Sequence, residues 1–260
     1  MLTLKQLTQY YPTSEQRSLK SILVEYIQYE ILDSLYKQPG SEQLSFMGGT
    51  AIRIVYGGNR FSEDLDFDNF GLSFHQFEKM TTAVVKDMQV KGFTIEFRLV
   101  QAGAYHCYIK FPHLLYQERV SSNATEKILV RIDTVHKEKN VAPDVYTMNR
   151  FDLFRRILVN PIAIILAQKM ITALERKRAR GRDFYDISYL YGKTRPQQLY
   201  IEHTTGMTFQ QFKQKLMQRC ATLNFRDLAK DVEPFLIDSS QKERVTDFPQ
   251  FLADQFARDI

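Results

Sequence analysis

The stretch GGTAIRIVYGGNRFSEDLDFD, from Gly48 to Asp68, decides the fold. An apolar run, Gln43–Met47, leads directly into its first glycine pair, which is the pattern of a strand that ends in a tight turn. We expect a helix over Thr50–Tyr56 and a second strand over Leu65–Asp68. The segment therefore predicts a strand, a glycine turn, a short helix and an acidic strand, in that order.

The acidic strand carries the first chemical signal. Side chains two residues apart on a strand point the same way, so one face would be polar and the other apolar. The polar face would hold Ser62, Asp64, Asp66 and Asp68. Adjacent carboxylates repel one another, and a hard divalent cation with oxygen ligands, Mg²⁺ or Mn²⁺, removes that conflict. Two such ions about 3.5–4 Å apart suit in-line nucleotidyl transfer.

Two other roles are possible for the acidic strand. A solvated acidic loop is the common role of such a segment. A calcium loop requires glycine at its sixth position and glutamate at its twelfth, where this chain has Asn69 and His75. The order of glycine pair and acidic strand favours a metal and phosphate site over both.

The glycine pair fits a phosphate-binding role. Glycine permits close approach of the backbone to a ligand, and the start of a helix offers free N–H groups to phosphate. We therefore predict that Gly48, Gly49 and Thr50, with Arg53, hold the phosphates of a nucleotide. A third metal carboxylate is predicted at Asp133, an aspartate within the apolar segment KILVRIDTV; the alternative is a strand-end residue.

A second constellation lies in AQKMITALERKRARGRDFYDISYL. Lys169 lies within an apolar helix that is predicted to begin at Asn160–Pro161 and to run to about Arg178, and it could reach a phosphate. The alternative is a lysine that extends to solvent at the helix edge. Asp183 and Asp186 lie one turn apart and could pair with Arg182 or Lys169, or one of them could act as a base.

The charge of the chain is concentrated near the same helix. The window Arg150–Arg182 carries nine basic and two acidic residues, a net charge of +7, whereas the whole chain carries +5 and the rest of it therefore −2. A local basic patch is typical of contact with nucleic-acid phosphates, although it could also be a solvated helix end. The predicted RNA-binding residues are Arg176, Lys177, Arg178, Arg180 and Arg182.

Length and composition set the remaining limits. The 260 residues, 44% apolar and 25% charged, are ordinary for a globular protein of one or two domains. Cys107 and Cys220 suggest neither a disulfide framework nor a metal site. No signal-peptide pattern and no apolar run of membrane-spanning length is visible, so we expect a cytoplasmic protein without a membrane partner.

The organisation of the chain changes near residue 150. Before it, helical patterns over 14–36 and 74–90 alternate with strand patterns over 93–100, 105–111 and 128–135. After it, only helical patterns follow, over 182–191, 208–220, 225–232 and 247–258. We predict an α+β protein with a mixed sheet and flanking helices in residues 1–150 and a helical domain in residues 151–260.

From Ser45 to Leu190 the two constellations together resemble the AbiEii/AbiGii-type toxins, a branch of the nucleotidyltransferase superfamily related to DNA polymerase beta. The resemblance implies a nucleotidyltransferase-like sheet and metal aspartates at Asp64 and Asp66, with Ser62 in the same motif. It matches Lys169 to the motif lysine, and Asp183 or Asp186 to the later acidic position. Asp133 matches the third carboxylate less securely.

The resemblance also implies a function. Members are toxins of toxin–antitoxin or abortive-infection (phage-defence) systems, and the MenT-type toxins add nucleotides to the 3′ end of tRNA. We therefore expect a Mg²⁺-dependent enzyme that transfers NMP from an NTP to an RNA acceptor, most simply tRNA, and that has a cognate antitoxin. Transfer to a protein side chain and a non-catalytic RNA-binding module remain the alternatives.

Overall fold

The computed structural model describes residues 1–138 and 141–258, and the chain divides into two compact units. Unit 1 consists of Met1–Val55 and Phe61–Asn160. Unit 2 consists of the short segment Tyr56–Arg60 and of the chain from Pro161 onward. The domain boundary predicted at residue 150 stays a prediction; the compact units are delimited after Asn160.

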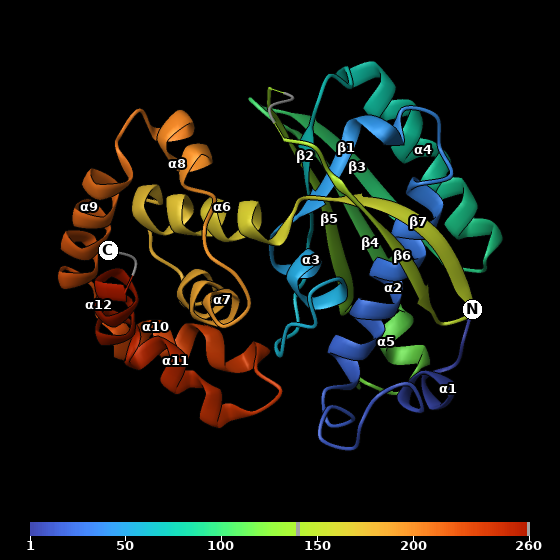
Figure 1. Cartoon of the computed structure of the whole chain (residues 1–260). Coiled ribbons are helices and arrows are strands. Elements are labelled where there is room, and N and C mark those ends of the chain that lie inside the picture. The colour runs from blue at the N-terminus through green and yellow to red at the C-terminus, as the bar shows by residue number, and fades with distance from the viewer. Residues whose placement is uncertain (139–140, 259–260) are drawn as a thin grey trace. The chain divides into compact units, whose positions relative to one another are not determined.

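The described residues of unit 1 form one mixed sheet of seven strands in the order β3-β4-β5-β2-β1-β7-β6 (Figure 1). The strands are β1 (Leu44–Met47), β2 (Leu65–Asn69), β3 (Glu96–Gln101), β4 (Tyr105–Pro112), β5 (Lys127–His136), β6 (Asp144–Arg150) and β7 (Leu153–Val159). The pairs β2·β5 and β1·β7 are parallel, and the other neighbours are antiparallel. The predicted α+β class with a mixed sheet and flanking helices is confirmed.

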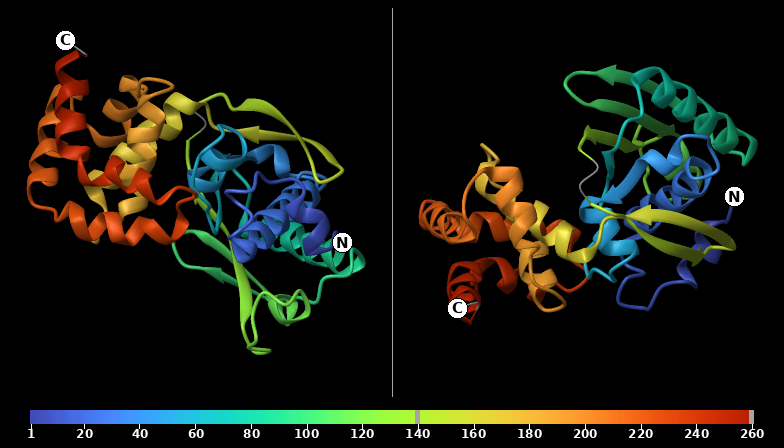
Figure 2. Two further views of the ribbon diagram at one scale, coloured as in Figure 1. Left: turned by 90° about the horizontal axis from the view of Figure 1, so that it is seen from below. Right: turned by 45° about the horizontal axis from the view of Figure 1, so that its top comes forward.

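Helices cover one face of this sheet. They are α1 (Leu4–Thr8), α2 (Leu19–Leu35), α3 (Gly48–Ile54), α4 (Phe74–Val90) and α5 (Leu114–Gln117), with a 3₁₀ turn at Ser41–Gln43. Figures 1 and 2 show α2 and α4 side by side against the sheet, and the two helices contact each other. Because α2 lies between the sheet and its neighbours, nearly all of its residues are buried.

Helix α4 has the bounds that its sequence predicts. Ser73 and Gln76 form a reciprocal capping box at its start, which satisfies backbone donors that the helix leaves unpaired. Phe77, Met80 and Val84 recur at helical spacing and are buried against the sheet. Gly92, at φ +95°, follows the helix in the left-handed conformation that ends many helices.

The hairpin of β6 and β7 was missed by the sequence analysis. Its turn places Phe151 and Asp152 at φ +58° and +61°, a conformation usually signalled by Asn-Gly or Asp-Gly. Here a buried contact replaces that signal, because the Phe151 ring lies among those of Tyr10, Tyr26 and Tyr29. Tertiary packing therefore stabilises a turn that the residues of the turn themselves do not predict.

In its described residues, unit 2 is helical from Pro161 onward, as predicted, apart from short turns and one isolated bridge. Its elements are α6 (Ile162–Glu175), α7 (Gly181–Tyr191), α8 (Gln198–Thr205), α9 (Phe209–Ala221), α10 (Phe225–Val232), α11 (Glu243–Thr246) and α12 (Phe248–Arg258), with 3₁₀ turns at Glu233–Phe235 and Ser239–Lys242. No helix in the described part of the chain is long and apolar enough to cross a membrane.

Two predictions about α6 are wrong. Pro161 stands at the N-cap position without a side-chain cap, because the amide of Asn160 is used elsewhere in unit 1. The helix ends at Glu175 rather than Arg178, so much of the basic run lies in a loop. Helix α7 begins afresh at Gly181, whose N–H donates to Asp231 Oδ2 at 2.9 Å.

Candidate active site

The register of β2 and β5 brings two predicted carboxylates together. Asp66 and Asp133 are direct partners on these parallel strands, and Met47 is the partner of Asp66 on β1. Neighbouring strands are about 4.8 Å apart, and residues in register point to the same face. Two carboxylates at that separation repel each other unless cations lie nearby.

Gly48 is required where β1 turns into α3. Its φ is +77°, which a residue with a side chain rarely adopts. An added Cβ would lie 3.0 Å from the Cβ and 3.1 Å from the Cγ of Asp66, and would collide with Oδ2. The Asp66 carboxylate therefore lies directly against the Gly48 backbone, which joins the predicted phosphate turn to the predicted metal strand.

The next residues of α3 attach it to the acidic segment. Gly49 and Thr50 are buried, and the Thr50 hydroxyl donates to the backbone carbonyl of Asp64. The Thr50 hydroxyl thus holds the chain in place just before β2. Its proton is used in this hydrogen bond within the protein.

Two basic side chains hold the carboxylates. Arg131 Nη2 donates to Asp64 Oδ2, and Arg131 Nη1 lies 3.6 Å from Asp133 Oδ2. His106 Nδ1 lies 2.8 Å from Asp133 Oδ1. The hydrogen bond to Asp64 raises the pKa of Arg131, and the charges of Asp133 and Asp66 add to this effect. Arg131 therefore contacts Asp64 and Asp133 directly and is influenced by the charge of Asp66.

Carboxylate oxygens are the type of ligand that a hard divalent cation prefers, and in this structure Arg131 contacts two of the carboxylates. Among the described residues, no group of three or more His, Cys, Asp or Glu side chains is already arranged around one point. The donor set nevertheless fits Mg²⁺, because the carboxylates of Asp66 on β2, Asp133 on β5 and Asp64 just before β2 offer oxygen ligands. Asp64, Asp66 and Asp133 are the residues that would hold the ion.

Asp68 does not extend this group. It is 3% exposed, and Asn160 Nδ2 donates to its Oδ2 at 2.6 Å. The Oδ1 atom of Asn160 accepts from Ser45 Oγ at 2.6 Å, so the amide connects β1, β2 and the end of β7. Asp68 thus has a structural role. Its spacing from Asp66 predicts instead that it belongs to the polar face with the other carboxylates.

Arg53 is also engaged inside unit 1. Its guanidinium lies 2.6 Å from Glu25 Oε2 and 2.5 Å from Glu15 Oε2, and only 11% of its side chain is exposed. Ser62 accepts a hydrogen bond from Gln28 Nε2 through its backbone carbonyl, at 3.0 Å. The structure therefore gives Arg53 a packing role that does not favour phosphate binding.

Unit 2 contains a buried charge cluster around Lys169. Lys169 Nζ lies 2.8 Å from Asp186 Oδ2 and 3.3 Å from Asp183 Oδ1, across α6 and α7. Arg60 donates to both oxygens of Asp186, at 2.7 and 2.6 Å, and Arg176 Nη1 lies 2.8 Å from Asp183. The predicted pairing of Lys169 with the two aspartates is present, but the bidentate partner of Asp186 is Arg60.

Opposite charges favour the ionised forms of Asp186 and Lys169 in this cluster. Burial alone would raise the pKa of Asp186, but Arg60 and Lys169 hold it below its usual value. Burial likewise disfavours charge on Lys169, yet the two aspartates raise its pKa. Removing one partner from such a buried pair leaves an uncompensated charge and is costly. The cluster therefore fixes the position of Lys169.

The predicted RNA-binding run is only partly available. Arg176 is paired with Asp183, Arg180 Nη1 lies 3.3 Å from Asp231 Oδ1, and the Arg182 guanidinium lies 4.7 Å from the Phe235 ring centroid. Lys177 and Arg178 are exposed in the loop between α6 and α7. These two remain the best candidates of the run for contact with phosphate.

Sequence reasoning missed Arg60, Arg131 and His106. A signal existed for Arg131, because it lies two residues before Asp133 on the same strand and so shares its face. Arg60 and His106 gave no comparable signal, since their partners lie 126 and 27 residues away in the chain.

Comparison with known proteins agrees with this geometry. The family model of the AbiEii toxin nucleotidyl transferases, type IV toxin–antitoxin system, matches residues 30–257. A Helicobacter pylori crystal structure assigned as a nucleotidyltransferase superposes with a TM-score of 0.57 at 14% identity, covering 93% of this chain and 98% of that chain. The structure of JHP933 from Helicobacter pylori gives 0.53 at 15% identity, covering 92% and 94%.

At these identities the two solved structures establish the fold alone, whereas the family model covers most of the chain. Comparison with curated proteins gives no match. The chain therefore belongs to the AbiEii family of toxin nucleotidyltransferases of type IV toxin–antitoxin systems.

Proposed function

We propose that the protein transfers a nucleoside monophosphate from an NTP to the 3′ end of an RNA, with tRNA as the acceptor, in a Mg²⁺-dependent reaction. The observation that carries the proposal is the register of Asp66 with Asp133, with the Gly48 backbone placed against Asp66. It combines a carboxylate group suited to a hard cation with a glycine turn at the start of a helix, where backbone N–H groups can bind phosphate.

Each residue of this group has a proposed task. Asp64, Asp66 and Asp133 hold Mg²⁺ or Mn²⁺, which when bound neutralises charge on the triphosphate. Gly48 and Gly49 allow the phosphates to approach the backbone. With an ion held by these carboxylates, the Arg131 guanidinium, which now contacts Asp64, would be available to the nucleotide phosphates.

The reaction forms a phosphodiester bond and breaks a phosphoanhydride bond of the NTP. The 3′ oxygen of the acceptor bonds to the α-phosphorus, the bond from that phosphorus to the bridging oxygen breaks, and pyrophosphate leaves with the electron pair. The hydroxyl proton passes to the Asp133 carboxylate, which His106 orients through the 2.8 Å contact with Oδ1.

Residues of unit 2 support the same chemistry by their charge. We assign Lys169 to the triphosphate, where it offsets negative charge in the transition state. Asp183 and Asp186 act as positioning residues for this lysine, because their carboxylates contact its ammonium group. The pKa of Asp186 is lowered by Arg60 and Lys169, which makes it a poor proton acceptor. Lys177 and Arg178 contact acceptor phosphates.

The biological setting follows from the family. A type IV toxin that extends tRNA would block translation in the cytoplasm of its host, and a cognate antitoxin would counteract it. Expression of the wild-type chain should then slow growth, whereas expression of Asp66→Asn should not. Equal inhibition by both proteins would contradict a catalytic toxin.

A labelling experiment tests the reaction. Wild type, Asp66→Asn and the control Glu42→Gln, which removes an exposed charge just before β1, are incubated with each α-labelled NTP, Mg²⁺ and total RNA. We expect label in the tRNA band for wild type and Glu42→Gln, and none for Asp66→Asn or with EDTA.

The same experiment separates the alternatives. Label that resists nuclease and is lost to protease identifies a protein acceptor. RNA binding without any labelling identifies a non-catalytic RNA-binding module. Undiminished labelling by Asp66→Asn would refute the proposed metal site.

A further inference from the structure

On β3, β4 and β5, the side chains that do not point into the core of unit 1 share one face, which we call the open face. On β5, Val130 and Ile132 point into the core, whereas Leu129 and Val135 are 42% and 41% exposed. On β4 the alternation is the same, with Ile109 buried. The open face of these strands carries Glu96, Arg98, Val100, His106, Tyr108, Lys110, Leu129, Arg131, Asp133 and Val135.

The register orders this face into rows that lead to the candidate active site. Arg98, Tyr108 and Arg131 are successive partners across the three strands, and Arg131 continues to Asp64. Two residues further along β5, Asp133 begins the carboxylate row. Two residues of a strand span roughly 7 Å. A chain bound along the face would therefore reach the carboxylates directly.

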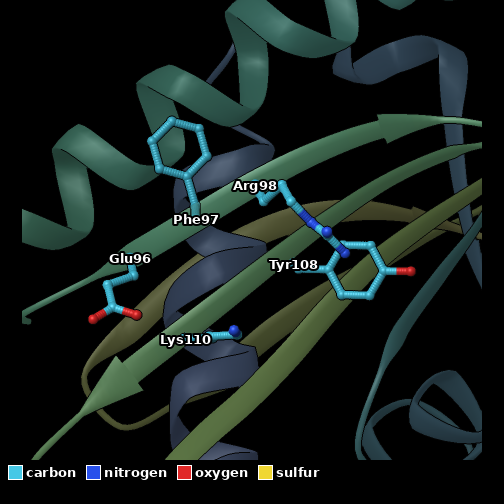
Figure 3. A pocket seen from close by; sticks show the side chains of 5 residues that line it. All are labelled: Glu96, Phe97, Arg98, Tyr108 and Lys110. Carbon is cyan, nitrogen blue, oxygen red and sulfur yellow. The ribbon is translucent and has the colours of Figure 1, made fainter.

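The middle of the face combines an aromatic ring with cations. The Arg98 guanidinium lies over the Tyr108 ring, 5.0 Å from its centroid. Figure 3 shows this pair with Lys110, Glu96 and Phe97. These five residues line a hollow of about 280 Å³. Glu96 is paired with Lys127 at 2.8 Å. In residues 1–138 and 141–258 neither Arg98 nor Lys110 forms an ion pair.

We propose that this face binds the single-stranded end of the RNA acceptor. A base stacks on the Arg98–Tyr108 pair, and Lys110 and Arg98 contact phosphates, so that the 3′ end is led toward Asp133. Single strands are bound by aromatic and guanidinium planes together with positive charge, whereas an acidic peptide would need only the charge. The inference rests on the proposed function for the identity of the acceptor.

Direct binding measurements test this surface without NTP or metal. Fluorescence anisotropy follows a labelled unstructured RNA at several salt concentrations, with wild type, Tyr108→Leu and Arg98→Gln/Lys110→Gln. The control is Lys79→Gln/Lys86→Gln, which removes the same charge from the exposed side of α4. All positions are on the surface, and circular dichroism checks that each variant is folded.

The expected effects differ between the variants. Tyr108→Leu should weaken binding about 5- to 150-fold, as for the loss of one stacked base, with an unchanged salt slope. The double cation variant should lower the salt slope by about 1.4, since each phosphate contact on a single strand contributes about 0.7. The α4 control should match wild type in both respects.

Several outcomes would overturn the inference. Binding equal to wild type in both face variants, or an equal loss in the α4 control, would place the RNA elsewhere. A wild-type chain that does not bind the single strand would do the same. Binding of a polyglutamate peptide that depends on Arg98 and Lys110, with RNA binding unaffected, would indicate a protein partner.

Failure of this surface can be distinguished from failure of the proposed function. If wild type labels RNA while the face variants bind RNA normally, only the surface assignment fails. If the face variants lose RNA binding while wild type labels no RNA, the surface stands and the proposed reaction fails.

Discussion

Replacing Gly48 with alanine should damage nucleotide transfer far more than it damages the fold. The new Cβ would lie 3.0 Å and 3.1 Å from Cβ and Cγ of Asp66, where carbon atoms prefer about 3.5–4.0 Å. The Asp66 side chain must then retreat by roughly 0.5–1 Å. A displacement near 1 Å in a catalytic arrangement can cost about 100-fold in rate.

The loss of stability that Gly48→Ala causes through backbone strain can be measured separately from its effect on the Asp66 carboxylate. A left-handed φ costs a residue with a Cβ about 1–2 kcal/mol, which lowers the melting temperature of a chain this long by roughly 2–8 °C. Gly92 supplies the matched control, because its φ is +95° and an added Cβ meets no described atom within 4 Å. Gly92→Ala should show the strain without the displaced carboxylate.

The assay compares initial labelling rates and melting temperatures of the two variants with wild type. Both should melt a few degrees lower, and only Gly48→Ala should lose about two orders of magnitude in rate. A Gly48→Ala enzyme with the rate of Gly92→Ala would refute the reasoning that the position of Asp66 against this turn matters for catalysis.

Two further predictions concern buried groups. Asp186→Asn should lower the free energy of unfolding by about 3–5 kcal/mol, measured with urea against exposed Asp227→Asn, because two cations stay buried without their partner. The folded pKa of Asp186 is lowered, so its contribution to the free energy of unfolding is complete above its unfolded pKa of about 3.9 and is lost as the pH falls toward the folded value. The melting temperature of the variant should therefore depend less on pH below pH 4 than that of wild type. Burial raises the pKa of Cys107 and Cys220 to about 12, so a disulfide reagent at pH 8 should modify neither thiol until urea is added; rapid modification of the folded chain would contradict this.

Local periodicity is what made the fold class predictable. The alternation in β5 singled out Asp133 as a polar residue on an apolar strand, and the structure places it beside Asp66. The bounds of α4 followed from its cap and its apolar spacing. Signals of this kind lie within a few residues of one another, so one sequence suffices to detect them.

Features that depend on distant pairing could not be predicted in the same way. Asp68 and Asp66 have the same spacing signal, yet only Asp68 meets the amide of Asn160, 92 residues away, and becomes structural. The sequence suggests phosphate binding for Arg53, but in the structure its guanidinium is paired with two glutamates from other segments. A charged residue shows its chemistry in the sequence, but its partner is set by the tertiary fold.

The segment Tyr56–Arg60 has a consequence for how the protein is made. The ribosome synthesises Arg60 126 residues before Asp186, the carboxylate that it clasps in unit 2. During translation Arg60 cannot pair with Asp186 until the intervening chain has been synthesised. Contacts between residues so far apart in sequence slow folding. A gene fragment that starts at Pro161 would encode Asp186 and Lys169 without Arg60. Unit 2 therefore cannot be expressed intact as one uninterrupted piece of the gene.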